Sequence, residues 1–219
     1  MLQGARKEGL LMTRIYDISM PITPDIPVYK NKPEKRPVFR ITSDHPEKGV
    51  RETRVELDVH TGTHIDAPLH MIERGETIES IPIENLITRC RVIDLTHVEG
   101  PISREDVESA GLHTGEFILF KTRNSKDTAF NPDFVFVGAE AARYLADLKV
   151  KGVGIDALGV ERSQPDHATH KALFGAGIIV IEGLRLEDVP SGSYQMIAMP
   201  IALVGIDAAP ARVVLVADE

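Results

Sequence analysis

Short strand-like runs dominate this chain and limit its possible folds more than any other feature. Runs rich in β-branched and aromatic residues occur at 14–18, 38–42, 54–59, 91–95, 117–121, 134–137, 153–155, 178–182, 196–204 and 212–216. Fewer helices are expected, over 103–111, 138–149 and 169–174. Because these helices do not alternate regularly with the strands, we expect an α/β fold built on a mixed β-sheet or barrel with peripheral helices, not a doubly wound parallel sheet.

The composition is that of an ordinary globular protein with one domain. The 219 residues are 42% hydrophobic and 26% charged, which is enough apolar material for one sizeable core. We expect residues 12–219 to form this single domain and residues 1–11, which precede Met12, to be a disordered extension. The segment 21–37 contains five prolines and predicts irregular structure that serves as a lid or a subunit-contact arm.

Charge and hydropathy exclude several kinds of partner. A formal net charge of -8 without a long basic run argues against binding to nucleic acid or anionic lipid. No apolar stretch approaches the roughly 20 residues that cross a bilayer, and the N-terminus lacks the apolar run of a secretory signal. The single Cys90 excludes an intrachain disulfide framework. We therefore expect a cytoplasmic protein that binds a small-molecule substrate and copies of itself, as a homodimer or homotetramer.

Three histidines and one aspartate lie close together in the segment 60–70. It reads His-Thr-Gly-Thr-His-Ile-Asp-Ala-Pro-Leu-His, so that His60, His64, Asp66 and His70 follow one another at spacings of four, two and four residues. Imidazole and carboxylate groups are the ligands that Zn²⁺, Mn²⁺ and Fe²⁺ take in proteins, and two histidines with one carboxylate leave positions open for water and substrate. The segment therefore predicts a divalent-metal site.

The chain must bend within this segment for its histidines to share an ion. In a regular strand His60 and His64 would lie roughly 13 Å apart, whereas metal–ligand bonds are about 2 Å long. The residues between them make a poor helix. Gly62 is suited to a bulge or tight turn, and we expect it to follow the strand 54–59, whose alternation predicts one apolar face and one polar face.

The segment 60–70 closely resembles the HxGTHxDxPxH signature of the cyclase-like metal-dependent hydrolases, the group that includes bacterial kynurenine formamidase and isatin hydrolase. Residues 16–21 resemble the opening strand of that family, residues 154–156 its central strand, and residues 170–184 its second ligand segment. These resemblances span about residues 14–205. In line with the strand pattern, they imply a barrel-like β/β/α fold of the swivelling-domain type.

The resemblance implies a site with one or two divalent ions. His60, His64 and Asp66 would hold the first ion, and Asp66 would bridge to a second ion held with His70, His170 and Glu182. In some members of the family a single ion binds, and the histidine that matches His70 serves as a base.

The residues of the second segment support part of this ligand set. Glu182 ends an apolar strand, where a buried carboxylate needs a cationic partner. His167 lies three residues before His170 and is an alternative ligand, because only the resemblance favours His170. Asp156, after the strand 153–155, either orients the site or caps the turn that follows it.

Hydrolysis is the simplest reaction for such a site. We expect the chain to cleave the C–N bond of a small amide or lactam by metal-activated water, with zinc as the first candidate metal and manganese or iron as alternatives. His70 or Glu182 would move the proton to the leaving nitrogen. Gly62 and Thr63, through their backbone amides, and Tyr29 are the expected substrate contacts.

The substrate is less well defined than the reaction. N-formylkynurenine, cleaved to kynurenine and formate, is the candidate that the resemblance suggests. The chain departs from the formamidase-type members at 28–33 and 157–160 and has no tryptophan, so aromatic stacking would come from Tyr29, Phe39 or Phe130. Hydrolysis of another cyclic amide or ester such as isatin, and a non-enzymatic metal- or small-ligand-binding role on the same fold, are the alternatives. A purely structural or assembly protein is a further alternative that the density of ligands disfavours.

Overall fold

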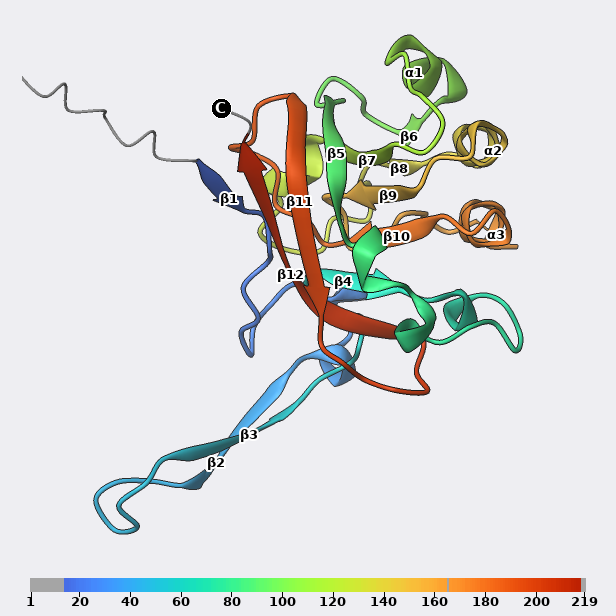
Figure 1. The fold of residues 1–219 in the computed structure, drawn as a ribbon. Coiled ribbons are helices and arrows are strands. Elements are labelled where there is room, and N and C mark those ends of the chain that lie inside the picture. The colour runs from blue at the N-terminus through green and yellow to red at the C-terminus, as the bar shows by residue number, and fades with distance from the viewer. Residues whose placement is uncertain (1–13, 165, 218–219) are drawn as a thin grey trace, which may run out of the picture.

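A closed ring of strands forms the centre of the molecule (Figure 1). The computed structural model describes residues 14–164 and 166–217, so the prediction for residues 1–11 lies outside the described part of the chain. The seven strands of the ring are β4 (His64–Asp66), β5 (Ile87–Asp94), β7 (Phe117–Lys121), β9 (Gly152–Ile155), β10 (Ile179–Glu182), β11 (Gly192–Pro200) and β12 (Ala208–Ala217). Their spatial order is β12, β11, β5, β7, β9, β10 and β4, and β4 closes the ring by pairing with β12.

The ring mixes parallel and antiparallel strands. β5, β7, β9 and β10 are parallel to one another, whereas the pairs β5–β11, β11–β12, β12–β4 and β4–β10 are antiparallel. A further strand, β1 (Ile15–Asp17), extends the sheet from the far end of β12. The predicted mixed barrel with few helices is confirmed.

Alternate side chains of one barrel strand belong to two different cores. Phe117 and Leu119 of β7 pack inside the barrel, whereas Ile118 and Phe120 point outward to a second core beneath the helices, as the two-residue period of a strand requires. Gly152 of β9 leaves room for this packing, because a β-carbon there would lie 2.2 Å from the ring of Phe117.

Three helices, α1 (Arg104–Ser109), α2 (Ala139–Leu148) and α3 (Ala168–Gly175), cover one side of the barrel (Figure 1). The start of α1 is marked in the sequence, since Ser103 and Asp106 form its capping box. α2 buries Ala141, Ala142 and Leu145 against the outer core. Among residues 14–164 and 166–217, none of the helices has the length and apolar character that a membrane crossing requires.

The prediction for residues 54–59 is wrong in part. The strand β3 (Glu52–Glu56) ends three residues earlier and pairs only with β2 (Val38–Ser43), as a hairpin that projects from the barrel (Figure 1). The expected apolar face is not fully buried, and among the described residues no third strand pairs with this hairpin. Val55 is 49% exposed.

Very short strands escape a periodicity analysis. The segments β4 and β6 (Pro101–Ile102) have three and two residues, too few to show alternation, whereas the short strand β8 (Phe136–Val137) lies within the predicted run 134–137. The predicted strand 196–204 is displaced, because β11 ends at Pro200. The segment 21–37 is irregular, as predicted. The short 3-10 helices are Tyr29–Asn31, Pro33–Lys35, Pro68–His70, Ile78–Ser80, Ile83–Asn85 and Arg123–Lys126.

Candidate metal centre

Pairing between β4 and β10 brings the two ligand segments together. In their antiparallel register His64 lies opposite Glu182, and Asp66 lies opposite Val180. The Nε2 atom of His64 is 3.3 Å from Oε2 of Glu182 and 3.3 Å from Oδ1 of Asp66. All three side chains are buried. A single strand pair therefore joins residues that are far apart in the sequence into one polar cluster.

A turn at Gly62 brings His60 to the same point. Asp58 accepts hydrogen bonds from the backbone amides of Thr61 and His60, each of 3.0 Å, and Gly62 follows with a φ of +66°, which favours glycine. Nδ1 of His60 then lies 2.9 Å from Oδ1 of Asp66. The predicted bend at Gly62 is confirmed, although it follows a loop and not a strand that reaches residue 59.

Helix α3 directs His170, and not His167, into the cluster. Nε2 of the buried His170 lies 3.6 Å from Oδ2 of Asp66 and 3.4 Å from Oε1 of Glu182. His167 caps the N-terminus of the helix, its side chain is 52% exposed, and it pairs with Glu161. The sequence left open whether His167 or His170 is the ligand, and the direction of α3 favours His170.

His70 stands on the open side of the cluster. It ends the 3-10 helix Pro68–His70, its ring centroid is 4.1 Å from that of His60 and 5.6 Å from that of His170, and its side chain is 26% exposed. Burial lowers the pKa of His70 despite its carboxylate neighbours. With His70, the structure brings all six predicted metal ligands together: His60, His64, Asp66, His70, His170 and Glu182.

Several buried polar atoms in the cluster have no hydrogen-bond partner among the described residues. They include Nε2 of His64, Nε2 of His170 and both carboxylate oxygens of Asp66. Because Nδ1 of His64 donates a hydrogen bond of 2.9 Å to the carbonyl of Gly62, a neutral His64 directs its Nε2 lone pair at Asp66. Buried lone pairs and carboxylates that converge in this way are suited to hold a cation between them.

The pKa values of the buried groups reflect the same excess of negative charge. Burial alone would lower the pKa of His64, but Asp66 and Glu182 outweigh it and raise this pKa to about 10. Burial and the neighbouring Asp66 would raise the pKa of Glu182, but the nearby imidazoles of His170 and His64 hold it at about 2. The two carboxylates are thus neutralised either by protons on the histidines or by a divalent ion that displaces those protons.

Among the described residues four groups of donor atoms are each compact enough for one ion. One joins His60, His70 and Asp207, another joins Glu161, His167 and His170, and the remaining two consist of predicted ligands alone. His60, His64 and Asp66 form the first of these two groups and Asp66, His70 and His170 the second, with the ligand atoms of each group within 4.8 Å of one another. Asp66 belongs to both, since Oδ1 faces His60 and His64 while Oδ2 faces His170. Nitrogen and oxygen donors of this kind fit zinc, manganese or iron.

Sequence analysis does not identify two further carboxylates of the site. Oδ2 of Asp207 lies 2.9 Å from Nε2 of His60 and 3.5 Å from Nδ1 of His70. Glu161 lies 3.4 Å from Nδ1 of His170. One signal was available for the first of them, because residues 153–157 and 204–208 both read Val-Gly-Ile-Asp-Ala.

A cavity of about 480 Å³ opens beside the cluster and is large enough for a small organic molecule. His60, His70, His170 and Glu182 line its inner wall, and Tyr29 lines its outer part. Tyr29 therefore stands where a substrate contact was predicted.

Gly62 and Thr63 lie behind the ligands and do not line this cavity. The hydroxyl of Thr63 accepts a hydrogen bond from the amide of Met20 and donates one of 2.6 Å to the carbonyl of Gly183. The carbonyl of Gly62 holds His64. Both residues thus support the ligand segments, and substrate contact through their backbone amides stays a prediction.

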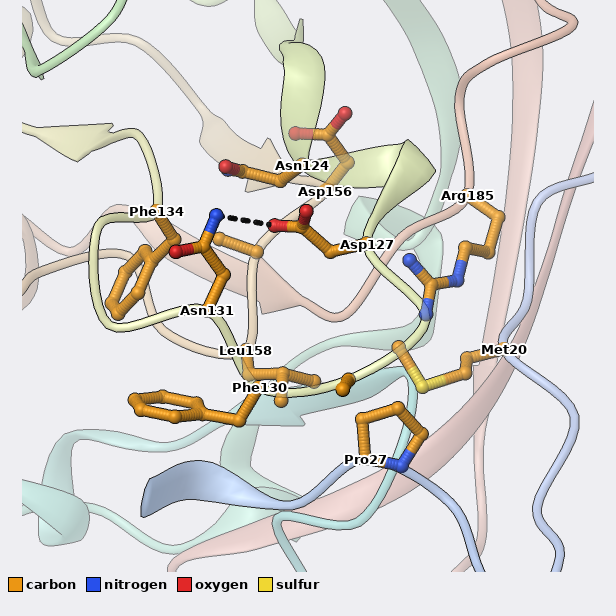
Figure 2. Close-up of a pocket in the computed structure, with 12 residues that line it drawn as sticks. Met20, Pro27, Asn124, Asp127, Phe130, Asn131, Phe134, Asp156, Leu158 and Arg185 are labelled. Atoms are coloured by element: carbon orange, nitrogen blue, oxygen red, sulfur yellow. Dashed lines mark hydrogen bonds between the residues drawn. The ribbon is translucent and has the colours of Figure 1, made fainter. Parts of the chain in front are cut away.

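A second hollow, on the other side of the loop that follows β9, is too small for a substrate (Figure 2). Its volume is about 20 Å³, which is room for about one water molecule. Asp156 on its wall accepts hydrogen bonds from the amide and hydroxyl groups of Thr122 and Ser125, and burial raises the pKa of Asp156 to about 6. These partners lie at the start of the 3-10 helix Arg123–Lys126, which precedes Asp156 in the chain, and not in the turn that follows it, so these contacts are not the expected cap of the following turn.

The mixed barrel, with a cluster of imidazoles and carboxylates beside a small-molecule cavity, defines the class of metal-dependent hydrolases. The kynurenine formamidase of Salinibacter ruber is 33% identical over 92% of this chain and 96% of its own length. The solved structure of a potential metal-dependent hydrolase with cyclase activity is 53% identical and has a TM-score of 0.90 over 95% of this chain and 100% of its own. Isatin hydrolase A from Labrenzia aggregata is 25% identical, with a TM-score of 0.78 over 94% of each chain.

The chain belongs to the putative cyclase family, whose sequence model matches residues 16–162. The match includes the whole segment 60–70, so the resemblance stated from that segment is confirmed.

Proposed function

We propose that this protein is a cytoplasmic hydrolase that cleaves the C–N bond of a small amide or lactam with one or two divalent ions, zinc first and manganese or iron as alternatives. One observation carries the proposal. The buried Nε2 atoms of His64 and His170 and both oxygens of Asp66 converge without hydrogen-bond partners among the described residues. Similarity to a kynurenine formamidase and to an isatin hydrolase supports the same reaction class.

Hydrolysis requires activation of a water molecule and transfer of a proton to the leaving nitrogen. A bound divalent ion would lower the pKa of a coordinated water toward about 7 and polarise the substrate carbonyl. His70 lines the cavity at the open side of the cluster, where it takes a proton from the attacking water and returns it to the leaving nitrogen. A bond forms between the water oxygen and the carbonyl carbon, and the C–N bond breaks. An open-chain amide gives a separate carboxylic acid and amine, whereas a lactam gives one ring-opened molecule that carries both groups.

Glu182 is the alternative proton carrier, but its contacts favour a ligand role. Its Oε1 atom accepts a hydrogen bond from the amide of Val160 and lies 3.4 Å from Nε2 of His170, and its Oε2 atom lies 3.3 Å from Nε2 of His64. Both carboxylate oxygens are therefore engaged inside the cluster, and His70 is left as the better proton carrier.

N-formylkynurenine is the first substrate that we propose. Tyr29 presents an aromatic ring to the cavity and packs edge-on against Phe130, with ring centroids 5.2 Å apart, which supports binding of an aryl group. Phe39, the other aromatic candidate, lies on the exposed hairpin strand β2 and does not line the cavity. Isatin is the second substrate, since an isatin hydrolase shares the fold.

The test combines metal analysis with a hydrolysis assay. The purified protein is reconstituted with Zn²⁺ or Mn²⁺, its metal content is measured by mass spectrometry, and turnover of N-formylkynurenine and isatin is followed. We expect one to two ions per chain and turnover of at least one compound. Metal without turnover on a panel of amides, lactams and esters would favour the non-enzymatic binding role, and failure to bind either metal would overturn the proposal.

We also propose that the protein self-associates into a homodimer or homotetramer. The hairpin of β2 and β3 exposes Val38, Phe39, Ile41 and Val55 by 40–54%, and a lone two-stranded hairpin is marginally stable in water without a packing partner. Light scattering coupled to gel filtration should give two or four times the mass of one chain. A monomeric mass at micromolar concentration would contradict the proposal.

A further inference from the structure

The two ring nitrogens of His60 face two different carboxylates. Nδ1 lies 2.9 Å from Oδ1 of Asp66 inside the cluster, and Nε2 lies 2.9 Å from Oδ2 of Asp207 on its outer side. A neutral imidazole has one N–H group and one lone pair. An acceptor at Nε2 places the N–H there and leaves the lone pair on Nδ1, directed at the cluster.

His64 follows the same arrangement, and His170 is oriented in the same sense. Nδ1 of His64 donates to the carbonyl of Gly62, and its Nε2 faces inward. Nε2 of His170 also faces inward, but its Nδ1 lies 3.4 Å from Oε2 of Glu161 and forms no hydrogen bond with the described residues. The carboxylate of Asp207 thus accepts a hydrogen bond from the outer N–H of His60, as the carbonyl of Gly62 accepts one from that of His64. Asp207 lies far from His60 in the sequence.

The backbone around Asp207 is hydrogen-bonded to residues that follow the metal-ligand segment 60–66. The carbonyl of Asp207 accepts a hydrogen bond of 2.9 Å from the amide of Ala67, and the carbonyl of Ile206 accepts one of 3.0 Å from the amide of Ile78. The amide of Gly205 donates to both carboxylate oxygens of Glu79. The loop before β12 therefore holds the carboxylate of Asp207 at a fixed distance from His60.

We propose that Asp207 is a positioning residue that fixes the tautomer and the ring orientation of His60 at the metal centre. The inference rests on the proposed metal-dependent function, because it assigns Asp207 a role through a metal ligand. Asp207 itself faces Nε2, on the opposite side of the His60 ring from Asp66, and is open to solvent, with 38% of its side chain exposed. Its contribution is therefore to the strength of metal binding by His60.

The test measures zinc affinity by competition with a chelator. We expect Asp207→Ala to weaken binding by about 10- to 100-fold, the usual cost of losing such an outer contact. Asp207→Asn should stay within about threefold of the parent, because its amide oxygen still accepts from Nε2. Glu79→Ala is the matched control, since it removes a carboxylate that holds the same loop but does not touch His60, and it should also stay within about threefold.

A second measurement separates positioning from general stability. In the Co²⁺-substituted parent the Nε2 proton of His60 should give a paramagnetically shifted, slowly exchanging NMR signal. Asp207→Ala should lose this signal or exchange it rapidly, whereas Asp207→Asn and Glu79→Ala should keep it. If Asp207→Ala does not fold without metal, Asp207→Ser replaces it, because the serine hydroxyl is too short to reach His60.

The outcomes distinguish this inference from the proposed function. A parent protein that binds no metal overturns the function itself. A parent that binds metal while Asp207→Ala keeps both its affinity and its proton signal overturns only the role of Asp207. Equal losses in Asp207→Ala and Asp207→Asn would make Asp207 a direct ligand or a source of charge, and an equal loss in Glu79→Ala would assign the effect to the loop. Either result contradicts positioning.

Discussion

The carbonyl oxygen of Gly62 occupies the place where a side chain on Gly183 would begin. A β-carbon on Gly183 would lie 2.2 Å from this oxygen, and Gly183 has a φ of +70°. The same carbonyl accepts the hydrogen bond from Nδ1 of His64. Two glycines, one in each ligand segment, therefore allow the chain to approach itself closely enough for His64 to face Glu182.

Gly183→Ala should destabilise the metal-free protein by about 2–4 kcal/mol, because a left-handed conformation without glycine costs about 1–2 kcal/mol and overpacking adds about 1–3 kcal/mol. Urea unfolding measures the change. Gly175→Ala, at the end of α3 with open space around its α-carbon, is the control and should change the unfolding free energy by less than about 0.5 kcal/mol. A shift of similar size in both variants would show that the contact with Gly62 is not tight.

His64→Ala should abolish near-stoichiometric metal binding, because His64 contributes a buried Nε2 that faces both Asp66 and Glu182. Metal content by mass spectrometry after equal dialysis is the measurement. His97→Ala removes an exposed histidine far from the cluster in sequence and should keep the metal content of the parent. Retention of the full metal content by His64→Ala would remove this residue from the ligand set.

His70→Gln should separate the role of a base from that of a ligand. If His70 moves the proton, kcat should fall by about 10²–10⁴-fold while at least one ion per chain remains bound, because His60, His64 and Asp66 form a complete group without it. Parallel measurement of kcat and metal content tests this expectation. A variant with full activity would exclude His70 as the proton carrier, and loss of every ion would make it an essential ligand.

The stability of the metal-free protein should depend on pH in a direction that the buried charges determine. The pKa of His64 is raised from 6.5 to about 10 in the folded state, so its stabilising contribution is complete below pH 6.5 and is lost as the pH rises through about 10. The pKa of Glu182 is lowered from 4.5 to about 2, so its contribution is complete above pH 4.5 and is lost as the pH falls through about 2. These two groups together favour the folded metal-free protein most between pH 4.5 and 6.5.

With metal present, the stability of the folded protein should rise with pH on the alkaline side instead of falling, because an ion must displace the proton on His64. The apparent zinc affinity should rise by about tenfold per pH unit for each proton displaced, between about pH 6 and 8. Unfolding midpoints with and without zinc, taken over this range, measure the effect. An affinity that does not change with pH would show that the histidines are already deprotonated without metal.

The ligand residues near Gly62 were accessible to sequence analysis because they are local. His60, His64 and Asp66 lie within seven residues, and the length of a strand alone showed that the chain must bend between them. Gly62 was identified for the same reason, since few other residues adopt the required positive φ.

The prediction of a strand over 54–59 was wrong in part. Alternation of apolar and polar residues indicates that one face favours burial, but it does not show which segment will cover that face. The apolar positions around Val55 alternate as a barrel strand would, but in the described part of the chain this strand pairs only with β2, and Val55 stays exposed. The same limit explains β4, whose three residues are held by pairing on both edges and carry no periodic signal of their own.

The sequence by itself determined the local chemistry of this protein: the run of imidazoles and a carboxylate, the glycine that lets it turn, and strands too numerous for a doubly wound sheet. Only the tertiary structure decided which distant groups join that run. The choice of His170 over His167 depends on the direction of α3, and the place of Asp207 beside His60 depends on the closure of the barrel through β12 and β4. Such contacts arise from strand pairing and packing between segments far apart in the chain, and a local pattern contains no information about which segments will meet.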